Sequence, residues 1–417
     1  MTQKQIVVVG GGVIGVCTAF FLADAGHEVV VIERNQNVAQ EASFAHAGII
    51  GPGYVTPWTM PGRLQRLMAR WRKTEAPLVI ARGADRATRR WLGRWMAEHE
   101  LERFRINRER LQRLAYYSRA VQQQLAEACQ IDYEQTDGVL QLFRTEHDRK
   151  QAETVIALLG EQEIVHRLLT ADEAREIEPA LASETRLAGA LYMPEDASGN
   201  CPLFTKKLRH AAQSIGVHFY LGSTVKAIEP QGGRISLQID EGSFQADAVV
   251  VAAGVDSARL LRPLGIQLPL HPVKGYSATA SIKNFDRAPQ AAIVDEAYKV
   301  AITRLGSRVR VAGTALLGET RDALHQGALR TLMKVGNDWF PQAANYTTAN
   351  FWCGVQPMLP DGPPVLGATP VRNVYVNIGH GANGWAMAAG SGRILANLIS
   401  GQAPEIDIEG LTLSRYG

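Results

Sequence analysis

Residues 6–34 read IVVVGGGVIGVCTAFFLADAGHEVVVIER, and this stretch decides the fold. Its first eighteen residues, Ile6 to Ala23, carry no charge, which raises the question of a membrane span. Eighteen residues barely reach spanning length, several glycines interrupt them, and acidic Asp24 follows. A signal peptide fits no better, because only Lys4 precedes the apolar run and no convincing small-x-small cleavage site is present. We therefore expect the stretch to belong to the folded protein.

The pattern within this stretch predicts a strand, a glycine turn, a helix and a second strand. Gln5 to Val9 is a β-branched run typical of a buried parallel strand. Val13 to Ala25 has the length and composition of a helix ended by Gly26, and Glu28 to Ile32 forms the second strand. The order strand, turn, helix, strand is that of a nucleotide-binding unit.

The glycines of the turn fit a dinucleotide. Gly10 permits a tight turn, Gly12 lets the backbone approach a pyrophosphate, and Gly15 lets the helix pack closely on the strand. The N-terminus of the helix offers unpaired N–H groups to the anion. Glu33 ends the second strand eighteen residues after Gly15, where its carboxylate can accept hydrogen bonds from ribose hydroxyls. A purely structural glycine turn is the alternative.

Length and composition set the frame for this unit. A chain of 417 residues is too long for one ordinary core, so two domains with a shared interface are expected. With 46% hydrophobic and 20% charged residues, the composition excludes a disordered chain. The four cysteines are far apart, and no spacing of His, Cys, Asp and Glu suggests a metal site or a disulfide framework.

The rest of the chain favours FAD over a nicotinamide cofactor. A nicotinamide enzyme usually completes its nucleotide domain within about a hundred further residues, whereas residues 54–130 are rich in Trp and Arg at helical spacing. Strand patterns of the nucleotide domain return at residues 216–229 and, after a hairpin signal at Gly232-Gly233, at residues 246–254. A strand, a glycine-rich turn and a helix follow from Asn373. Three later segments that return to the nucleotide domain suit FAD, because FAD is long enough to need contacts from all of them.

A series of motifs in this order extends to the C-terminus. Together with the N-terminal unit, the chain resembles the FAD-dependent D-amino acid dehydrogenase small-subunit family, within the D-amino acid oxidase and glycine oxidase group. The motifs are SFAHAGIIGPGYVTPWTMPG (43–62), LQLFRTEHD (140–148), HPVKGYSAT (271–279), YKVAITRLGSRVRVAG (298–313), PMLPDGPPVLG (357–367) and NIGHGANGW (377–385).

The resemblance implies an α/β fold with two interleaved domains. One is an FAD-binding domain of the glutathione-reductase type, and the other is a substrate domain built on a mixed α+β sheet. Residues 1–85, 186–265 and 355–417 would form the FAD-binding domain, and residues 86–185 and 266–354 the substrate domain.

The resemblance also implies which residues hold FAD, several of them through the main chain. The ADP half would lie on Gly10, Gly12, Val13, Ile14, Gly15, Glu33 and Arg34, the pyrophosphate and flavin on Ser43, His46, Ala47, Gly48 and Ile49, the adenine on Val225, the pyrophosphate also on Ala253 and Gly254, and the pyrimidine edge on Gly381, Asn383 and Gly384. Covalent attachment of FAD through His46 is the less expected alternative to a hydrogen bond.

The chemistry that the resemblance implies asks little of side chains. The Cα hydrogen of the substrate leaves as hydride to flavin N5, and the resulting imine is hydrolysed by water. Because positioning supplies most of the rate, the side chains to find are carboxylate anchors, for which Tyr276 and Arg304 match family positions on predicted strands. A solvated strand end is the alternative for Arg304. His380 is expected near the flavin, where a charge that titrates near neutrality would tune the local field.

One position departs from the family pattern. The family usually has Gly-Leu-Arg-Pro before its Thr-Pro-Asp-Gly motif, with the arginine on the substrate carboxylate, whereas this chain has GVQPMLPDG with Gln356 at that place. A glutamine brings no charge and loses the bidentate ion pair. Either Gln356 is a tolerated replacement, or another arginine takes the carboxylate, or the substrate is unusual: a bulkier D-amino acid, a cyclic secondary amine such as hydroxy-D-proline or D-proline, or an amine without that carboxylate. A non-catalytic nucleotide-binding subunit or sensor also stays open.

Residues 61–120 are strongly basic, with sixteen Lys and Arg against six Asp and Glu. Tryptophans at positions 58, 71, 91 and 95 interleave with the arginines, and residues 89–114 have the pattern of one or two amphipathic helices. Such a surface suits anionic lipid headgroups, and a solvated face or a partner-subunit surface is the alternative; no nucleic-acid motif accompanies the charge. Family relatives are peripheral inner-membrane dehydrogenases. The expected partners are an amino acid or amine substrate, a quinone or other respiratory acceptor, and an anionic membrane or a partner subunit contacted through residues 61–120. The expected location is the cytoplasm, either free or peripheral on the inner face of the cytoplasmic membrane.

Overall fold

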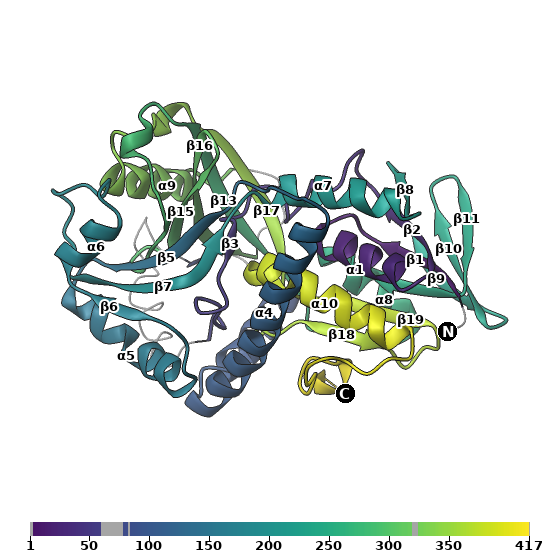
Figure 1. Cartoon of the computed structure of the whole chain (residues 1–417). Helices are drawn as coiled ribbons and strands as arrows, with labels where there is room; N and C mark the ends of the chain where they lie inside the picture. Colours follow the sequence, from purple (N-terminus) through teal and green to yellow (C-terminus); the bar gives the residue numbers. More distant parts are fainter. Residues whose placement is uncertain (1–2, 60–77, 82–83, 319–323, 417) are drawn as a thin grey trace.

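Two β-sheets lie side by side in the computed structural model, which describes residues 3–59, 78–81, 84–318 and 324–416 (Figure 1). The smaller sheet has the strand order β18-β19-β12-β1-β2-β8. All neighbours in it are parallel except β18 and β19. Its strands are β1 (Gln5–Val9), β2 (Glu28–Glu33), β8 (His218–Leu221), β12 (Ala248–Val251), β18 (Val365–Ala368) and β19 (Val374–Ile378).

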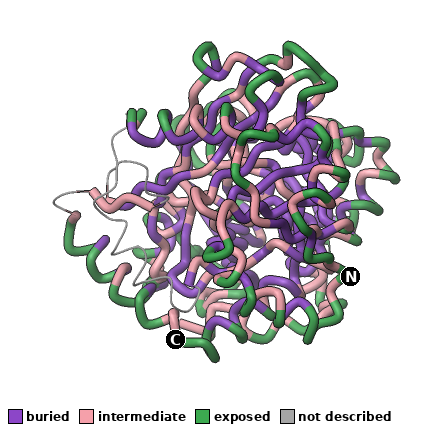
Figure 2. Tube along the Cα trace, turned by 90° about the vertical axis from the view of Figure 1, so that its left-hand side faces the viewer, coloured by how far each residue is buried: buried purple, intermediate pink, exposed green. Residues whose placement is uncertain are grey.

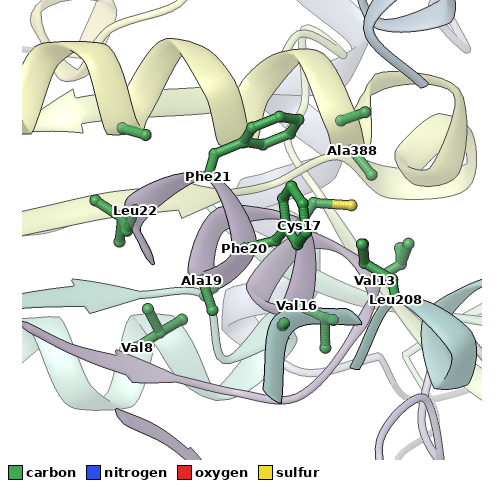
Figure 3. Close-up of a cluster of buried hydrophobic side chains, with 14 of the residues drawn as sticks. Val8, Val13, Val16, Cys17, Ala19, Phe20, Phe21, Leu22, Leu208 and Ala388 are labelled. Carbon is green, nitrogen blue, oxygen red and sulfur yellow. The ribbon is translucent and has the colours of Figure 1, made fainter. Parts of the chain in front are cut away.

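The centre of the smaller sheet is the strand, turn, helix, strand unit predicted from residues 6–34. β1 pairs in parallel with β2 on one side and β12 on the other, so its valines are buried on both faces. Helix α1 (Val13–Asp24) buries nine of its twelve residues, because α7 (Cys201–Ser214) and α10 (Gly384–Ile399) pack against it. Figure 3 shows side chains of α1 between Ala388 of α10 and Leu208 of α7.

A three-stranded antiparallel sheet lies in the chain between β8 and β12 of the smaller sheet. It consists of β9 (Ala227–Gln231), β10 (Arg234–Ile239) and β11 (Gly242–Ala246). The predicted hairpin at Gly232-Gly233 is confirmed, because Gln231 pairs with Arg234 across these two residues. Their φ angles of +56° and +89° are the left-handed values that a two-residue hairpin turn requires.

The larger sheet is mixed and has the order β17-β13-β16-β15-β14-β5-β7-β3, with β4 added to β16 and β6 to β7. Its strands are β3 (Ile49–Ile50), β4 (Leu78–Ile80), β5 (Thr136–Phe143), β6 (Arg167–Leu169), β7 (Gly189–Ser198), β13 (His271–Ser281), β14 (Ala292–Asp295), β15 (Val300–Leu305), β16 (Arg308–Leu317) and β17 (Asn350–Met358). The predicted α/β fold with a mixed-sheet second domain is therefore confirmed.

The two faces of the larger sheet have different neighbours. Tyr276 and Ala278 of β13 pack in an apolar cluster with α9 (Gln326–Trp339). Val273 faces the other way, onto Trp91 and Trp95 of α3 (Arg86–Ala97). Because side chains alternate along a strand, Gly275 and Ser277 share the face of Val273. Two further helices, α5 (Glu146–Glu161) and α6 (Ala171–Ile177), and the short α8 (Ser257–Leu261) complete the layers.

Helices connect the two sheets. In the described part of the basic segment, residues 89–114 span parts of two helices, α3 and the long α4 (Leu101–Ala128), in agreement with the one or two helices predicted there. α4 and α10 cross between the sheets (Figure 1).

Trp71 and the rest of residues 60–77 lie outside the described residues. Among the described helices, none is both long and apolar enough to span a membrane. Figure 2 shows that most buried residues lie in the interior of the molecule and that most exposed residues lie at its edges.

The sheets divide the chain differently from the predicted domain ranges. β3, β4 and β7 fall within residues predicted for the FAD-binding domain, yet all three pair in the larger sheet. β3 follows directly after the segment 43–48, so this segment passes from one sheet to the other. The predicted ranges therefore remain a prediction of which residues fold together as each domain.

The contact between α10 and α1 depends on a glycine. A Cβ at Gly392 would lie 2.9 Å from the backbone nitrogen of Thr18. We expect Gly392→Ala to lower the free energy of unfolding by about 1–3 kcal/mol, since the helices must move apart. Gly93→Ala is the matched control, because a Cβ there has nothing within 4 Å on the exposed side of α3. It should raise stability by about 0.5–1 kcal/mol through helix propensity. Urea unfolding measures both, and equal effects would contradict the close contact.

Candidate functional site: two cavities that meet between the sheets

The first cavity, of about 160 Å³, lies where β1, β2 and β12 end and α1 begins. Gly12 is the N-cap of α1 and, as a glycine, has no side chain that could cap the helix. Val13 N–H donates to Ser43 Oγ at 3.1 Å, which ties the segment after β2 to the helix start. The other first-turn N–H groups lie at the positive end of the helix dipole, which favours an anion here.

The glycine turn at this cavity leaves no room for side chains. A Cβ at Gly15 would lie 1.9 Å from the carbonyl oxygen of Gly10. A Cβ at Gly10, whose φ is +111°, would lie 2.5 Å from the carbonyl oxygen of Ala252. The turn therefore packs against both α1 and the end of β12, and its backbone forms the floor of the cavity.

Glu33 holds the turn from the end of β2. Its Oε2 accepts the Gly11 N–H at 2.6 Å, and its Oε1 accepts the backbone N–H and the side-chain Nδ2–H of Asn35, both at 2.8 Å. The carboxylate is buried and lines the cavity. A carboxylate with several donors in the protein is fixed in place, which suits recognition of a ribose hydroxyl next to it.

Three buried polar atoms on the wall of the first cavity have no hydrogen-bond partner in the described protein. They are Ser223 Oγ, Asn377 Oδ1 and Trp385 Nε1. Unpaired buried polar groups are rare in folded proteins, and a bound molecule with its own donors and acceptors is one way to pair them. The wall of the cavity therefore offers donors and acceptors that a polar cofactor such as FAD would pair. Sequence reasoning missed these three residues, although Trp385 ends the quoted motif NIGHGANGW.

Most of the predicted cofactor residues meet at this cavity. Those that line it are Gly10, Gly12, Val13, Ile14, Glu33, Arg34, Ser43, His46, Val225, Ala253, Gly254, Gly381 and Gly384. Ala47, Ile49 and Asn383 line the second cavity instead. Gly15 and Gly48 line neither; a Cβ at Gly48 would lie 2.4 Å from the Gly199 carbonyl oxygen. Their individual roles toward FAD stay predictions.

The second cavity, of about 280 Å³, lies against the larger sheet. It shares His46, Gln356 and Ala382 with the first cavity, so the two cavities meet at these residues. Gln356 therefore stands at the place where a substrate would face a cofactor. The far parts of the cavity are bounded by Trp58 and Trp95 on one side and by Gln141, Glu296 and Lys299 on another. Sequence reasoning missed the last three, although Lys299 lies in the quoted motif YKVAITR.

Both histidines of the site are neutral. Burial lowers the pKa of His380 to about 3. Burial and, to a lesser degree, the charge of Arg310 lower the pKa of His46 to about 3 as well. The expectation that His380 titrates near neutrality is therefore wrong, because its ring is enclosed beside Ser391 Oγ at 3.2 Å. In His46, Nδ1 accepts the Gly48 N–H at 2.9 Å, so the ring proton is on Nε2.

The two predicted carboxylate anchors have different positions. Tyr276 borders the second cavity, but its side chain belongs to the apolar cluster under α9. Arg304 lines neither cavity; its Nε donates to the Gly306 carbonyl at 3.3 Å and its guanidinium lies 5.3 Å from the Phe285 ring centroid. The side chain of the neighbouring Thr303 lies on the opposite face of β15, where its Oγ1 donates to the Ala47 carbonyl at 2.8 Å.

A buried arginine fixes the segment at the junction. Arg310 donates from Nε to Thr279 Oγ1 at 3.1 Å and from Nη1 to the His46 carbonyl at 3.3 Å. Burial lowers the pKa of Arg310 to about 10, so it stays charged at neutral pH. Arg310 lines neither cavity and instead holds the backbone that carries His46.

In the ranges that the structure describes, no three His, Cys, Asp or Glu side chains cluster as a metal site.

Comparisons with known proteins agree with this geometry. Residues 5–398 match the family model for FAD dependent oxidoreductases. The chain is 41% identical over 415 residues to a D-amino acid dehydrogenase of Bradyrhizobium diazoefficiens, with 99% of each chain covered. It is 42% identical to a D-amino acid dehydrogenase of Allorhizobium ampelinum, covering 99% of this chain and 98% of that one. The structure is similar to glycine oxidase from Geobacillus kaustophilus, with a TM-score of 0.79, 25% identity and 100% and 99% of the two chains covered.

Loss of the Glu33 carboxylate should weaken FAD binding. In Glu33→Ala the turn loses its hydrogen bond at Gly11 and the ribose loses its expected acceptor, so we expect the Kd for FAD to rise at least about 10-fold. Titration of the apoprotein, followed by quenching of FAD fluorescence, measures it. Glu28→Ala is the control, because Glu28 lies exposed at the other end of β2. An unchanged Kd in Glu33→Ala would exclude this role.

The two neutral histidines make stability depend on pH. Their folded-state pKa values lie below the ordinary value of 6.5, so below that pH the unfolded chain binds protons that the folded protein does not. Stability should therefore fall as the pH drops from 6.5 toward 3, by about 1.4 kcal/mol per pH unit for each histidine. His380→Asn should remove about half of this two-histidine slope. Urea unfolding between pH 7 and pH 5 tests this, and identical slopes would show that His380 is not protected.

Proposed function

The chain belongs to the FAD-dependent oxidoreductase family, and from this premise we propose that it is a dehydrogenase of D-amino acids. The observation that supports the substrate class is the similarity, at 41% and 42% identity over essentially the full length, to two D-amino acid dehydrogenases. Among the described residues, His46, Gln356 and Ala382 line both cavities, so a small molecule in the second cavity would lie next to a cofactor in the first, as its oxidation requires.

Bound FAD supplies a hydride acceptor to this site. With FAD bound, a D-amino acid in the second cavity would give its Cα hydrogen to the flavin as hydride and become an imino acid, which water would hydrolyse to a 2-oxo acid and ammonia. Gly10, Gly12 and the start of α1 would hold the pyrophosphate, and Glu33 the ribose. The family residues that would hold the flavin itself come from the segment that contains His46 and from the turn before α10.

The protein side of the reaction is positioning in an enclosed site. His46 is neutral and presents its Nε2–H, and Gln356 adds an uncharged amide, so the junction offers hydrogen bonds without a net charge. Arg310 and Thr303 each bind a carbonyl of the segment that carries His46, which keeps the junction from moving with the substrate. Fixed geometry of this kind supplies much of the rate when a hydride moves between two bound partners.

We also propose that a respiratory acceptor such as a quinone takes the electrons at a membrane surface. Helix α3 exposes Arg86, Arg89, Arg90 and Arg94 and contains no acidic residue, while Trp91 and Trp95 are buried beneath it. Four exposed guanidinium groups on one helix suit anionic headgroups. A partner subunit is the other surface that these charges would fit.

Anaerobic reduction of the purified yellow protein tests the reaction. We expect D-amino acids, but not their L-enantiomers, to bleach the flavin absorption, and turnover to follow with an artificial electron acceptor. A second arm uses hydroxy-D-proline and D-proline. Bleaching by these alone would replace the proposed substrate by a cyclic secondary amine. An FAD-loaded protein that no amino acid bleaches would instead support a non-catalytic subunit.

A further inference from the structure

The second cavity has one cationic side chain of the Lys or Arg type among the described residues that line it, and that residue is Lys299. The predicted anchor Arg304 and the buried Arg310 do not line the cavity, because Arg304 lies against Phe285 and Arg310 binds the His46 carbonyl. Gln356, where the family resemblance places an arginine, has no charge. Two carboxylates line the same cavity: Glu296, which is paired with Lys299, and Asp148, which accepts hydrogen bonds from the backbone N–H and the hydroxyl of Thr145. Among the described lining residues, Lys299 is therefore the one Lys or Arg side chain that a substrate carboxylate could contact.

Lys299 is part of a small network on the cavity wall. Its Nζ forms an ion pair with Glu296, and Glu296 also accepts a hydrogen bond from Gln141 Nε2. The two contacts use different oxygens of Glu296, so the carboxylate of Glu296 is satisfied by the protein. The side chains of Lys299 and Glu296 are 27% and 13% exposed, and all three residues line the cavity. Glu296 thus holds the ammonium group of Lys299 at the wall of the cavity.

The backbone that presents this pair is firmly held. Asp295 is fully buried and its Oδ1 accepts the N–H groups of Ala297 and Tyr298 at 3.0 and 3.2 Å. Its Oδ2 accepts from Arg144 Nε and from Trp339 Nε1, both at 2.7 Å. The turn between β14 and β15 is therefore tied to the buried base of the sheet.

Arg144 completes this support. Its guanidinium lies 4.8 Å from the Tyr298 ring centroid and 5.0 Å from that of Trp339, and Nη1 pairs with Asp338 at 2.8 Å. Lys299 itself has a φ of +54°, a left-handed value that is rare for a side-chain residue. Such backbone is kept where the surroundings over-determine it, and it occurs often at ligand sites.

The neighbouring strand is shaped to fit this turn. A Cβ at Gly313 of β16 would lie 2.6 Å from the Lys299 carbonyl oxygen, so only glycine lets β16 approach here. The same stretch of β16, residues 312–315, lines the cavity. The position of Lys299 is therefore determined by two strands and a buried carboxylate.

We propose that Lys299 binds the carboxylate of the substrate and supplies the charge that Gln356 does not. The proposal rests on the proposed function, since it assigns a residue to the amino acid of that reaction. A lysine acts on a carboxylate as a compact point charge, whereas an arginine forms a planar fork. The contact is charge-assisted and enclosed, so it is stronger than a neutral hydrogen bond. The amide of Gln356 remains available for a second, uncharged contact.

The experiment uses the FAD-loaded enzyme with Lys299→Met, Lys299→Arg and, as a matched control, Lys283→Met on the exposed loop after β13. KM and kcat are measured for D-alanine and D-glutamate. Binding of benzoate, a carboxylate that is not oxidised, is followed separately by its perturbation of the flavin absorption, with benzamide as the uncharged probe. In Lys299→Met we expect the Kd of benzoate to rise about 10- to 100-fold and that of benzamide to stay unchanged. Lys299→Arg should restore part of the affinity, and Lys283→Met should behave as the unaltered enzyme.

The KM values for D-alanine and D-glutamate show which carboxylate of the substrate contacts Lys299. A rise in KM for both D-alanine and D-glutamate places the α-carboxylate on Lys299. A rise for D-glutamate alone places the side-chain carboxylate there, and both outcomes support the proposal. Unchanged KM values and an unchanged Kd of benzoate in Lys299→Met would overturn it. An unaltered enzyme whose flavin is reduced by no D-amino acid would instead overturn the proposed function, and the benzoate titration still reports on Lys299.

Discussion

The close packing of the turn after β1 is the constraint on which the rest of the structure depends. A Cβ at Gly15 would overlap the Gly10 carbonyl, and a Cβ at Gly10 would overlap the Ala252 carbonyl. The turn therefore brings the backbones of β1, α1 and β12 into direct contact, with no room for a side chain between them. The end of β2 holds the turn, because Gly10 N–H donates to the Ile32 carbonyl and Gly11 N–H donates to Glu33 Oε2, while Gly10 and Gly12 line the first cavity. A cofactor bound on this backbone has its position fixed by the packing of the sheet, and the second cavity is useful only because that position is fixed.

The two sheets cooperate through one short segment. Residues 43–50 begin at Ser43 beside the start of α1 and end in β3 of the larger sheet. Between these ends, the carbonyls of His46, Ala47 and Gly48 are bound by Arg310, Thr303 and the Gly199 N–H. A charged arginine is costly to bury without an ionic partner, and here its hydrogen bonds to a carbonyl and a hydroxyl recover part of that cost. The segment therefore transmits the geometry of the cofactor site to the substrate side.

The nucleotide site was predictable from sequence because its determinants are local. Gly10, Gly12, Gly15 and Glu33 lie within one strand, turn, helix, strand unit, so periodicity and spacing place them together. The substrate site depends on contacts between distant strands. Arg304 and Thr303 differ by one residue, and only the direction of β15 in the sheet decides that Thr303 reaches the junction. Tyr276 likewise lies on a strand whose alternation turns its ring toward α9. Burial, which sequence does not report for a single histidine, makes His380 neutral.

The charges of the substrate cavity follow from the same non-local arrangement. Lys299 stands in a motif together with Arg304, and by residue type the arginine is the stronger candidate for a carboxylate. With Lys299 as the proposed anchor, the fold reverses that order, since the turn after β14 is held by buried Asp295 and places Glu296 and Lys299 at the cavity wall. Among the described residues that line this cavity, Lys299 is paired with Glu296, and Asp148 is a second carboxylate. The charged side chains of the cavity are therefore separate from its junction with the cofactor cavity, where His46 and Gln356 are uncharged.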